Sequence, residues 1–175
     1  MSENVLDSRR GTSSFLHDKV VRKPTAFGTI VLGGLVVALL DGLFAITYYG
    51  LILGVPKLRI FQTVAAGLIG TTRAYSGGVK TFLLGICLHI VVATCIATVF
   101  YFASLKLPIL IQHPIFSGLI YGVVAYLGMK LIVTPLSAIG RRPLPRFSIF
   151  IVEILGHVFL VGLPIALLAR RSARD

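Results

Sequence analysis

Five ionisable side chains stand inside long apolar stretches of this chain: Asp41, His89, Lys130, Glu153 and His157. Ionisable groups are costly to surround with hydrocarbon, so they usually face a protein interior or water and pair with one another. Two carboxylates can offset one lysine and one protonated histidine, so a cluster of all five need bury no net charge. Such residues can form a hydrogen-bonded network, a proton relay or a ligand set, and we take them as the candidate site.

The apolar stretches that hold these residues are long enough to cross a bilayer as helices. Crossing takes about 20 apolar residues, and four blocks reach that length, namely 27–53, 79–105, 114–138 and 147–169. Hydrophobic residues make up 56% of the 175 residues and charged residues 13%, whereas soluble domains carry roughly 25% charged residues. We therefore predict an all-α membrane protein, a bundle of four transmembrane helices within residues 27–171.

The segments outside these blocks have simpler interpretations. Residues 1–26 are predicted to be a polar cytoplasmic N-terminal tail and residues 172–175 a C-terminal tail. The apolar segment 60–70 is too short to cross and is interrupted by polar and glycine residues. We predict that it forms a short interfacial or re-entrant helix between the first and second spans.

The positive charge of the chain indicates a membrane surface as the partner. Seventeen Lys and Arg against six Asp and Glu give a net charge of +11, and most of the cations flank the apolar blocks, where they favour lipid head groups. No basic segment is interleaved with stacking aromatic residues, so we expect no nucleic-acid binding.

Cation placement also predicts the topology, because four spans put both termini on one side. That side would carry nine cations, Arg9, Arg10, Lys19, Arg22, Lys23, Lys106, Arg170, Arg171 and Arg174. The other side would carry seven, Lys57, Arg59, Arg73, Lys80, Arg141, Arg142 and Arg146. The bias predicts cytoplasmic termini in the inner, or cytoplasmic, membrane.

Helical spacing places the five ionisable residues toward helix contacts. Three of them share a face with small residues: Asp41 with Gly34, Ala38, Gly42 and Ala45, His89 with Gly85, Ala93 and Ala97, and Lys130 with Gly118, Gly122 and the larger Tyr126. Small residues allow membrane helices to approach closely. Glu153 and His157 lie one turn apart, and counting residues places all five within about 9 Å in depth. We therefore predict one buried polar cluster.

The C-terminal half of the chain resembles a family of bacterial inner-membrane proteins, the YagU-like group. The matching residues are Thr134-Pro135-Leu136, the loop prolines Pro143 and Pro145, Glu153-Ile154-Leu155-Gly156-His157, Arg170-Arg171 and, in the second span, His89-Ile90. The resemblance covers about the last ninety residues. Lys130 stands where the group can show histidine, and Asp41 lies near where it can show lysine. The resemblance implies an inner-membrane location and an association with acid resistance, but no biochemical activity.

Several functions are compatible with the sequence. The sequence contains no Gly-rich phosphate loop, nucleophile elbow or zinc-protease motif, which favours a non-enzymatic protein, although Glu153 or His157 could act as a base in a membrane-embedded hydrolase. We predict a structural or accessory membrane protein without a cofactor or metal, with a membrane-protein partner or a second copy as possible partners. One alternative is proton or small-solute translocation linked to acid stress. Another is haem held by His89 and His157, or a metal bound by these histidines with Asp41 and Glu153.

Overall fold

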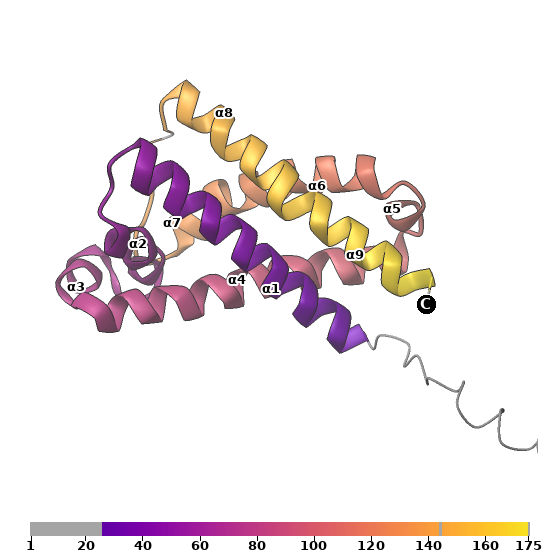
Figure 1. The fold of residues 1–175 in the computed structure, drawn as a ribbon, viewed down its shortest axis with the longest axis horizontal. Coiled ribbons are helices and arrows are strands. Elements are labelled where there is room, and N and C mark those ends of the chain that lie inside the picture. The colour runs from indigo at the N-terminus through magenta and orange to yellow at the C-terminus, as the bar shows by residue number, and fades with distance from the viewer. Residues whose placement is uncertain (1–25, 144, 175) are drawn as a thin grey trace, which may run out of the picture.

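The computed structural model describes residues 26–143 and 145–174, which are mostly helical and contain no strand. Four long helices dominate this part of the chain (Figure 1). They are α1 (Ala26–Ala45) with η1 (Ile46–Ile52), α4 (Gly78–Lys106), α6 (Pro114–Gly128) with η2 (Met129–Val133) and α7 (Thr134–Leu136), and α8 (Phe147–Gly156) with η3 (His157–Gly162) and α9 (Leu163–Arg174). Each is long and apolar enough to cross a membrane, as predicted. The η segments are π-helical.

The helix ends differ from the predicted ends by more than one residue at two places. Residues 172–174, predicted as part of a tail, continue α9, because arginine and alanine are good helix formers. Thr29 also donates a hydrogen bond of 2.7 Å to Ser172 and holds this turn against α1. The third long helix ends at Leu136 rather than 138, because Ser137 has an extended backbone. Residues 1–25 of the predicted N-terminal tail lie outside the described residues.

Two short helices, α2 (Lys57–Ile69) and α3 (Thr71–Ser76), connect the first and second long helices. Helix α2 takes the place of the predicted 60–70 segment. In Figure 1 it is seen nearly end-on, whereas the long helices run across the view. It packs so closely on α4 that a Cβ atom at Gly85 would collide with the carbonyl group of Phe61. The Ala138 N–H also donates to the Gly67 carbonyl (2.8 Å).

Small residues fill the contacts between the long helices. The main core combines residues of α1, α4, η3 and α9, namely Val37, Ala38, Ala93, Ala97, Phe100, Val161, Ile165, Ala166 and Ala169. Where α6 meets η3, a Cβ atom at Gly162 would collide with the backbone of Gly118 and Gly122. Glycine is therefore required here by the close approach of two backbones, as is typical of helix pairs in membranes.

Large apolar side chains cover the outside of the bundle. Leu39 is 63% exposed, Phe102 57%, Phe116 67% and Phe159 54%, and each comes from a different long helix. Contiguous apolar surface of this kind is rare on soluble monomers and marks a membrane or partner contact. Many large apolar side chains thus point outward, whereas alanine and glycine fill much of the space between the helices, together with a few large residues such as Phe100 and Tyr126.

The bundle has two distinct ends (Figure 1). We call the end that carries α2, α3 and residues 137–143 the loop end. The opposite end carries the start of α1, the short helix α5 (Ile109–Gln112) and the end of α9, and we call it the terminal end.

Candidate functional site

Glu153 is a buried carboxylate that receives donors from two other long helices. The hydroxyl of Tyr49, which lies in η1, donates a hydrogen bond to Oε1 of Glu153. The hydroxyl of Tyr126 in α6 donates to Oε2 at 2.7 Å. The ammonium group of Lys130 in η2 lies 3.0 Å from Oε2 and 3.3 Å from Oε1. We call Tyr49, Tyr126, Lys130 and Glu153 the Glu153 group, and it joins three of the four long helices.

The donors of the Glu153 group match the carboxylate that accepts their hydrogen bonds. An ionised carboxylate only accepts hydrogen bonds, and here two hydroxyls and one ammonium group supply the donors. Glu153 is 7% exposed, and the neighbouring lysine compensates its charge. Buried ion pairs are tolerated when the geometry is good and the remaining lone pairs are satisfied. No buried side-chain nitrogen or oxygen in the described part of the chain lacks a hydrogen-bond partner.

His157 contacts this group through its ring and not through the carboxylate. Its Nδ1 lies 3.0 Å from the backbone carbonyl of Glu153, one turn earlier, and because a carbonyl only accepts, Nδ1 carries the proton. The imidazole meets the Tyr126 ring edge to face, with 5.2 Å between ring centroids. Phe150 packs on the same Tyr126 ring at 5.5 Å. The histidine therefore borders the Glu153 group but does not share its hydrogen bonds.

The π-helical segments coincide with this part of the bundle. Tyr49 lies in η1, Lys130 lies in η2, and η3 begins at His157, four residues after Glu153. A π-helical turn contains an extra residue, which rotates the side chains that follow it relative to an α-helix. Single π turns within α-helices occur frequently at functional sites. Three separate helices thus change their winding where they approach Glu153.

Asp41 and His89 form a second, smaller pair between α1 and α4. His89 Nε2 donates to the Ala38 carbonyl at 3.0 Å and lies 3.8 Å from Oδ2 of Asp41. The imidazole also packs edge to face against Phe61 of α2, with centroids 5.6 Å apart. Both side chains are partly exposed, His89 by 16% and Asp41 by 22%. The pair thus lies where α1, α2 and α4 meet.

The structure places the five residues of the candidate site in two groups. Within the described residues, no hydrogen bond or ion pair joins the Asp41–His89 pair to the Glu153 group. At 1.5 Å per residue, Glu153 lies about 9 Å from the loop end of its helix, whereas His89 lies about 16 Å from the start of α4. Phe44 lies between Asp41 and Tyr49 along the first long helix, and its ring packs against Gly156. The five residues therefore lie in two separate groups at different depths, and not in the single cluster that was predicted.

Two members of the Glu153 group, Tyr49 and Tyr126, were not among the predicted site residues. Tyr126 could have been found, because it precedes Lys130 by one turn on the face that carries Gly118 and Gly122. Tyr49 has no comparable signal, because it stands beside Tyr48 and its direction depends on the π-helical winding of η1. Tyr48 instead stacks on Phe44.

The predicted ligand residues do not converge. His89 belongs to the Asp41 pair and His157 borders the Glu153 group, and each donates to a backbone carbonyl. Within residues 26–143 and 145–174, no group of three or more His, Cys, Asp and Glu side chains is placed to hold a metal ion.

Comparison of the chain with protein-family models, curated proteins and solved structures gives no match. The resemblance to the YagU-like group stays a prediction from the sequence.

Proposed function

We propose that this chain is a non-enzymatic structural or accessory protein of the inner membrane, crossing it four times, in which the Glu153 group locks the first, third and fourth spans together. The observation that carries this proposal is the set of donors around Glu153, which come from Tyr49 in the first long helix and from Tyr126 and Lys130 in the third. Every strong donor in the group points at one carboxylate, which is an arrangement that fixes how helices pack.

Membrane insertion is supported by the apolar side chains on all four long helices and by the cations at both ends of the bundle. Helix α2 fits an interfacial position. It exposes Lys57 and Arg59 beside Leu58 and Leu68, while its other face, with Ile60 and Ala65, is buried. Cations that flank spans favour lipid head groups. We place the terminal end, with both termini, in the cytoplasm.

Membrane insertion is tested by isolating the membranes and extracting them with alkaline carbonate. The topology is tested separately with reporter fusions. We expect the chain to resist extraction. Reporter fusions should locate the C-terminus on the cytoplasmic side and a fusion point after Gly140 on the opposite side. Release of the chain by carbonate would contradict insertion, and the reverse reporter pattern would contradict the topology.

The structural role is tested by comparing single and paired substitutions in the ion pair. Glu153→Gln leaves Lys130 without its counter-charge, and Lys130→Met leaves Glu153 without its cation, so each alone should lower the thermal stability of the purified protein. The double variant removes both charges and should recover much of that loss. Lys106→Met, an exposed cation at the end of α4, is the matched control and should leave stability unchanged. A double variant as unstable as the sum of the two single variants would argue against a locking role.

A second candidate function is proton translocation, and it has one observation in its favour. Tyr49, Glu153 and Tyr126 form a continuous series of proton-exchanging groups, with Lys130 beside them and His157 against the Tyr126 ring. If the protein translocates protons, liposomes that contain the wild-type protein should show a proton flux. This flux should be absent in Glu153→Gln and also in the double variant with Lys130→Met. A stability-only role predicts no flux in the wild-type protein.

A further inference from the structure

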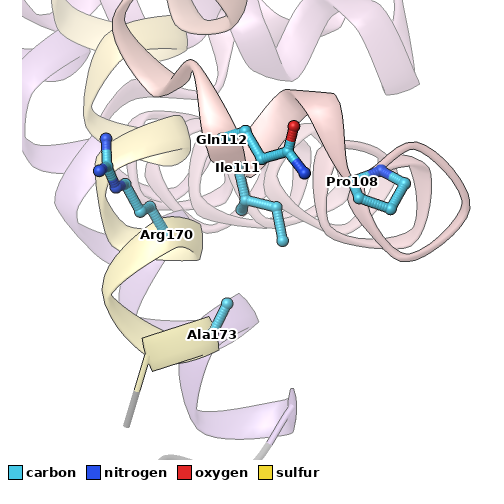
Figure 2. Close-up of a pocket in the computed structure, with 5 residues that line it drawn as sticks. All are labelled: Pro108, Ile111, Gln112, Arg170 and Ala173. Atoms are coloured by element: carbon cyan, nitrogen blue, oxygen red, sulfur yellow. The ribbon is translucent and has the colours of Figure 1, made fainter.

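A cleft opens at the terminal end of the bundle, away from both polar groups. It has a volume of about 380 Å³ and lies between α5 and the last turns of α9. Figure 2 shows Arg170 and Ala173 of α9 on one side and Pro108, Ile111 and Gln112 on the other.

Packing on both sides holds the walls of this cleft in place. On one side, the hydrogen bond from Thr29 to Ser172 fixes the end of α9 against α1. On the other side, Leu110 and Ile111 of α5 pack against the main core. The Gln112 N–H closes α5 by donating to the Pro108 carbonyl at 3.1 Å. The cleft is therefore part of the packed end of the bundle.

The polar groups of the cleft suit an anion. Arg170 carries a planar guanidinium group with five N–H donors, and the Gln112 amide, with two more, lies on the other side of the cleft (Figure 2). Among the described residues, no carboxylate lines the cleft, and neither of their ion pairs involves Arg170. The guanidinium fork matches the oxygens of a phosphate group especially well.

The apolar groups of the cleft favour a phosphate that belongs to a lipid. Pro108, Ile111 and Ala173 form apolar walls. Leu167 lies one turn deeper than Arg170 on the same face of α9 and is 45% exposed, which offers a path for an acyl chain. We infer that this cleft binds the phosphate of an anionic phospholipid, with its acyl chain along Leu167. The inference rests on the proposed membrane insertion, which would put the end of α9 at the level of the head groups.

The neighbouring Arg171 distinguishes phosphate binding by Arg170 from a simpler role of a cation at the end of a helix. Cations near a helix C-terminus also offset the partial negative charge of the last carbonyl groups. Arg171 can do the same but does not line the cleft. Arg171→Gln is therefore the matched control for Arg170→Gln, because both remove one cation from the same helix end.

The test is native mass spectrometry of the full-length protein in detergent, titrated with phosphatidylglycerol or phosphatidylcholine. The wild-type protein should retain phosphatidylglycerol in preference to phosphatidylcholine. One cation near a membrane surface contributes enough for Arg170→Gln to weaken this binding roughly fivefold. Arg171→Gln should bind like the wild-type protein. Ala173→Trp fills the cleft from an exposed position without changing the charge, and it should also lose the bound lipid.

Three results would overturn the inference: equal binding of the two lipids, equal effects of Arg170→Gln and Arg171→Gln, or normal binding by Ala173→Trp. Displacement of the lipid by millimolar inorganic phosphate would identify a site for a soluble anion instead. Size-exclusion profiles show whether each variant is folded, and Ala173→Trp decides the question if Arg170→Gln does not fold. A chain that resists carbonate extraction but shows no lipid preference refutes this inference alone, whereas a chain released by carbonate refutes the proposed membrane insertion.

Discussion

The hydroxyl of Tyr126 donates a hydrogen bond of 2.7 Å to Oε2 of Glu153, which joins the third and fourth long helices at a buried position. Tyr126 is 1% exposed, and its ring also touches Phe150 and His157 of the fourth helix. One residue thus contributes both the apolar packing and the polar specificity of this helix pair.

Tyr126→Phe should destabilise the protein modestly. The substitution keeps the ring and its contacts and removes one of the three donors to Glu153, while Tyr49 and Lys130 remain. Side-chain hydrogen bonds between membrane helices contribute about 0.6 kcal/mol on average and up to about 1.7 kcal/mol. Thermal unfolding in detergent should show a lower midpoint for Tyr126→Phe than for Tyr101→Phe, whose hydroxyl has no hydrogen-bond partner among the described residues. Equal midpoints would mean that the Tyr126 hydroxyl is dispensable.

Gly162→Ala should be among the most damaging single-methyl changes in the bundle. The added Cβ would collide with the Gly118 carbonyl and the Gly122 backbone, and backbone cannot move aside as a side chain can. Overpacking of a tight core costs about 1–3 kcal/mol. The control is Gly128→Ala, because a Cβ there meets open space and alanine favours the helix. Urea or heat titrations should find Gly162→Ala clearly destabilised and Gly128→Ala at least as stable as the wild-type protein, and the opposite order would refute the close α6–η3 contact.

Gly85→Ala should loosen α2 from α4 without unfolding the bundle. Its Cβ would collide with the Phe61 carbonyl, so α2 has to move away from α4. A cysteine placed at Ala66, which is fully buried, reports this movement once Cys87 and Cys95 have been replaced by serine. A maleimide reagent should label this cysteine slowly in the parent and much faster in Gly85→Ala. Unchanged labelling would show that α2 does not depend on this contact.

Substitutions in the Asp41–His89 pair should have unequal effects. His89 donates to the Ala38 carbonyl at 3.0 Å and packs on Phe61, whereas its distance of 3.8 Å from Asp41 is too long for a hydrogen bond. His89→Leu should therefore lower the unfolding midpoint more than Asp41→Asn does. A larger effect of Asp41→Asn would show that the charge of the carboxylate contributes more than the contacts of the imidazole ring.

The long helices were the most predictable part of this fold. Runs of more than 20 apolar residues identify a helix that can cross a bilayer without any knowledge of its neighbours. The predicted starts at Phe27, Pro114 and Phe147 lie within one residue of the structural ones. The fourth helix extends farther than predicted because its last turn is polar, and apolar length does not report a polar turn.

The grouping of the ionisable residues could be predicted only in part. Residue counts place all five residues within about 9 Å of one another in depth, and the spacing between the two groups is comparable to the error of predicted helix ends. Helical spacing of 3.6 residues also fails across η1, η2 and η3, where each π turn holds an extra residue. The direction of Tyr49 therefore could not be read from its position in the sequence.

The sequence by itself determined that four long apolar helices form and that five ionisable residues lie within them, because hydropathy and length are local properties of the chain. The tertiary structure decided which donors meet Glu153, that Asp41 and His89 form a separate pair, and that α5 and α9 border a cleft. These features depend on how helices distant in sequence rotate and approach one another. Contacts between glycine backbones, such as Gly162 with Gly118, and the π-helical turns set that rotation and approach.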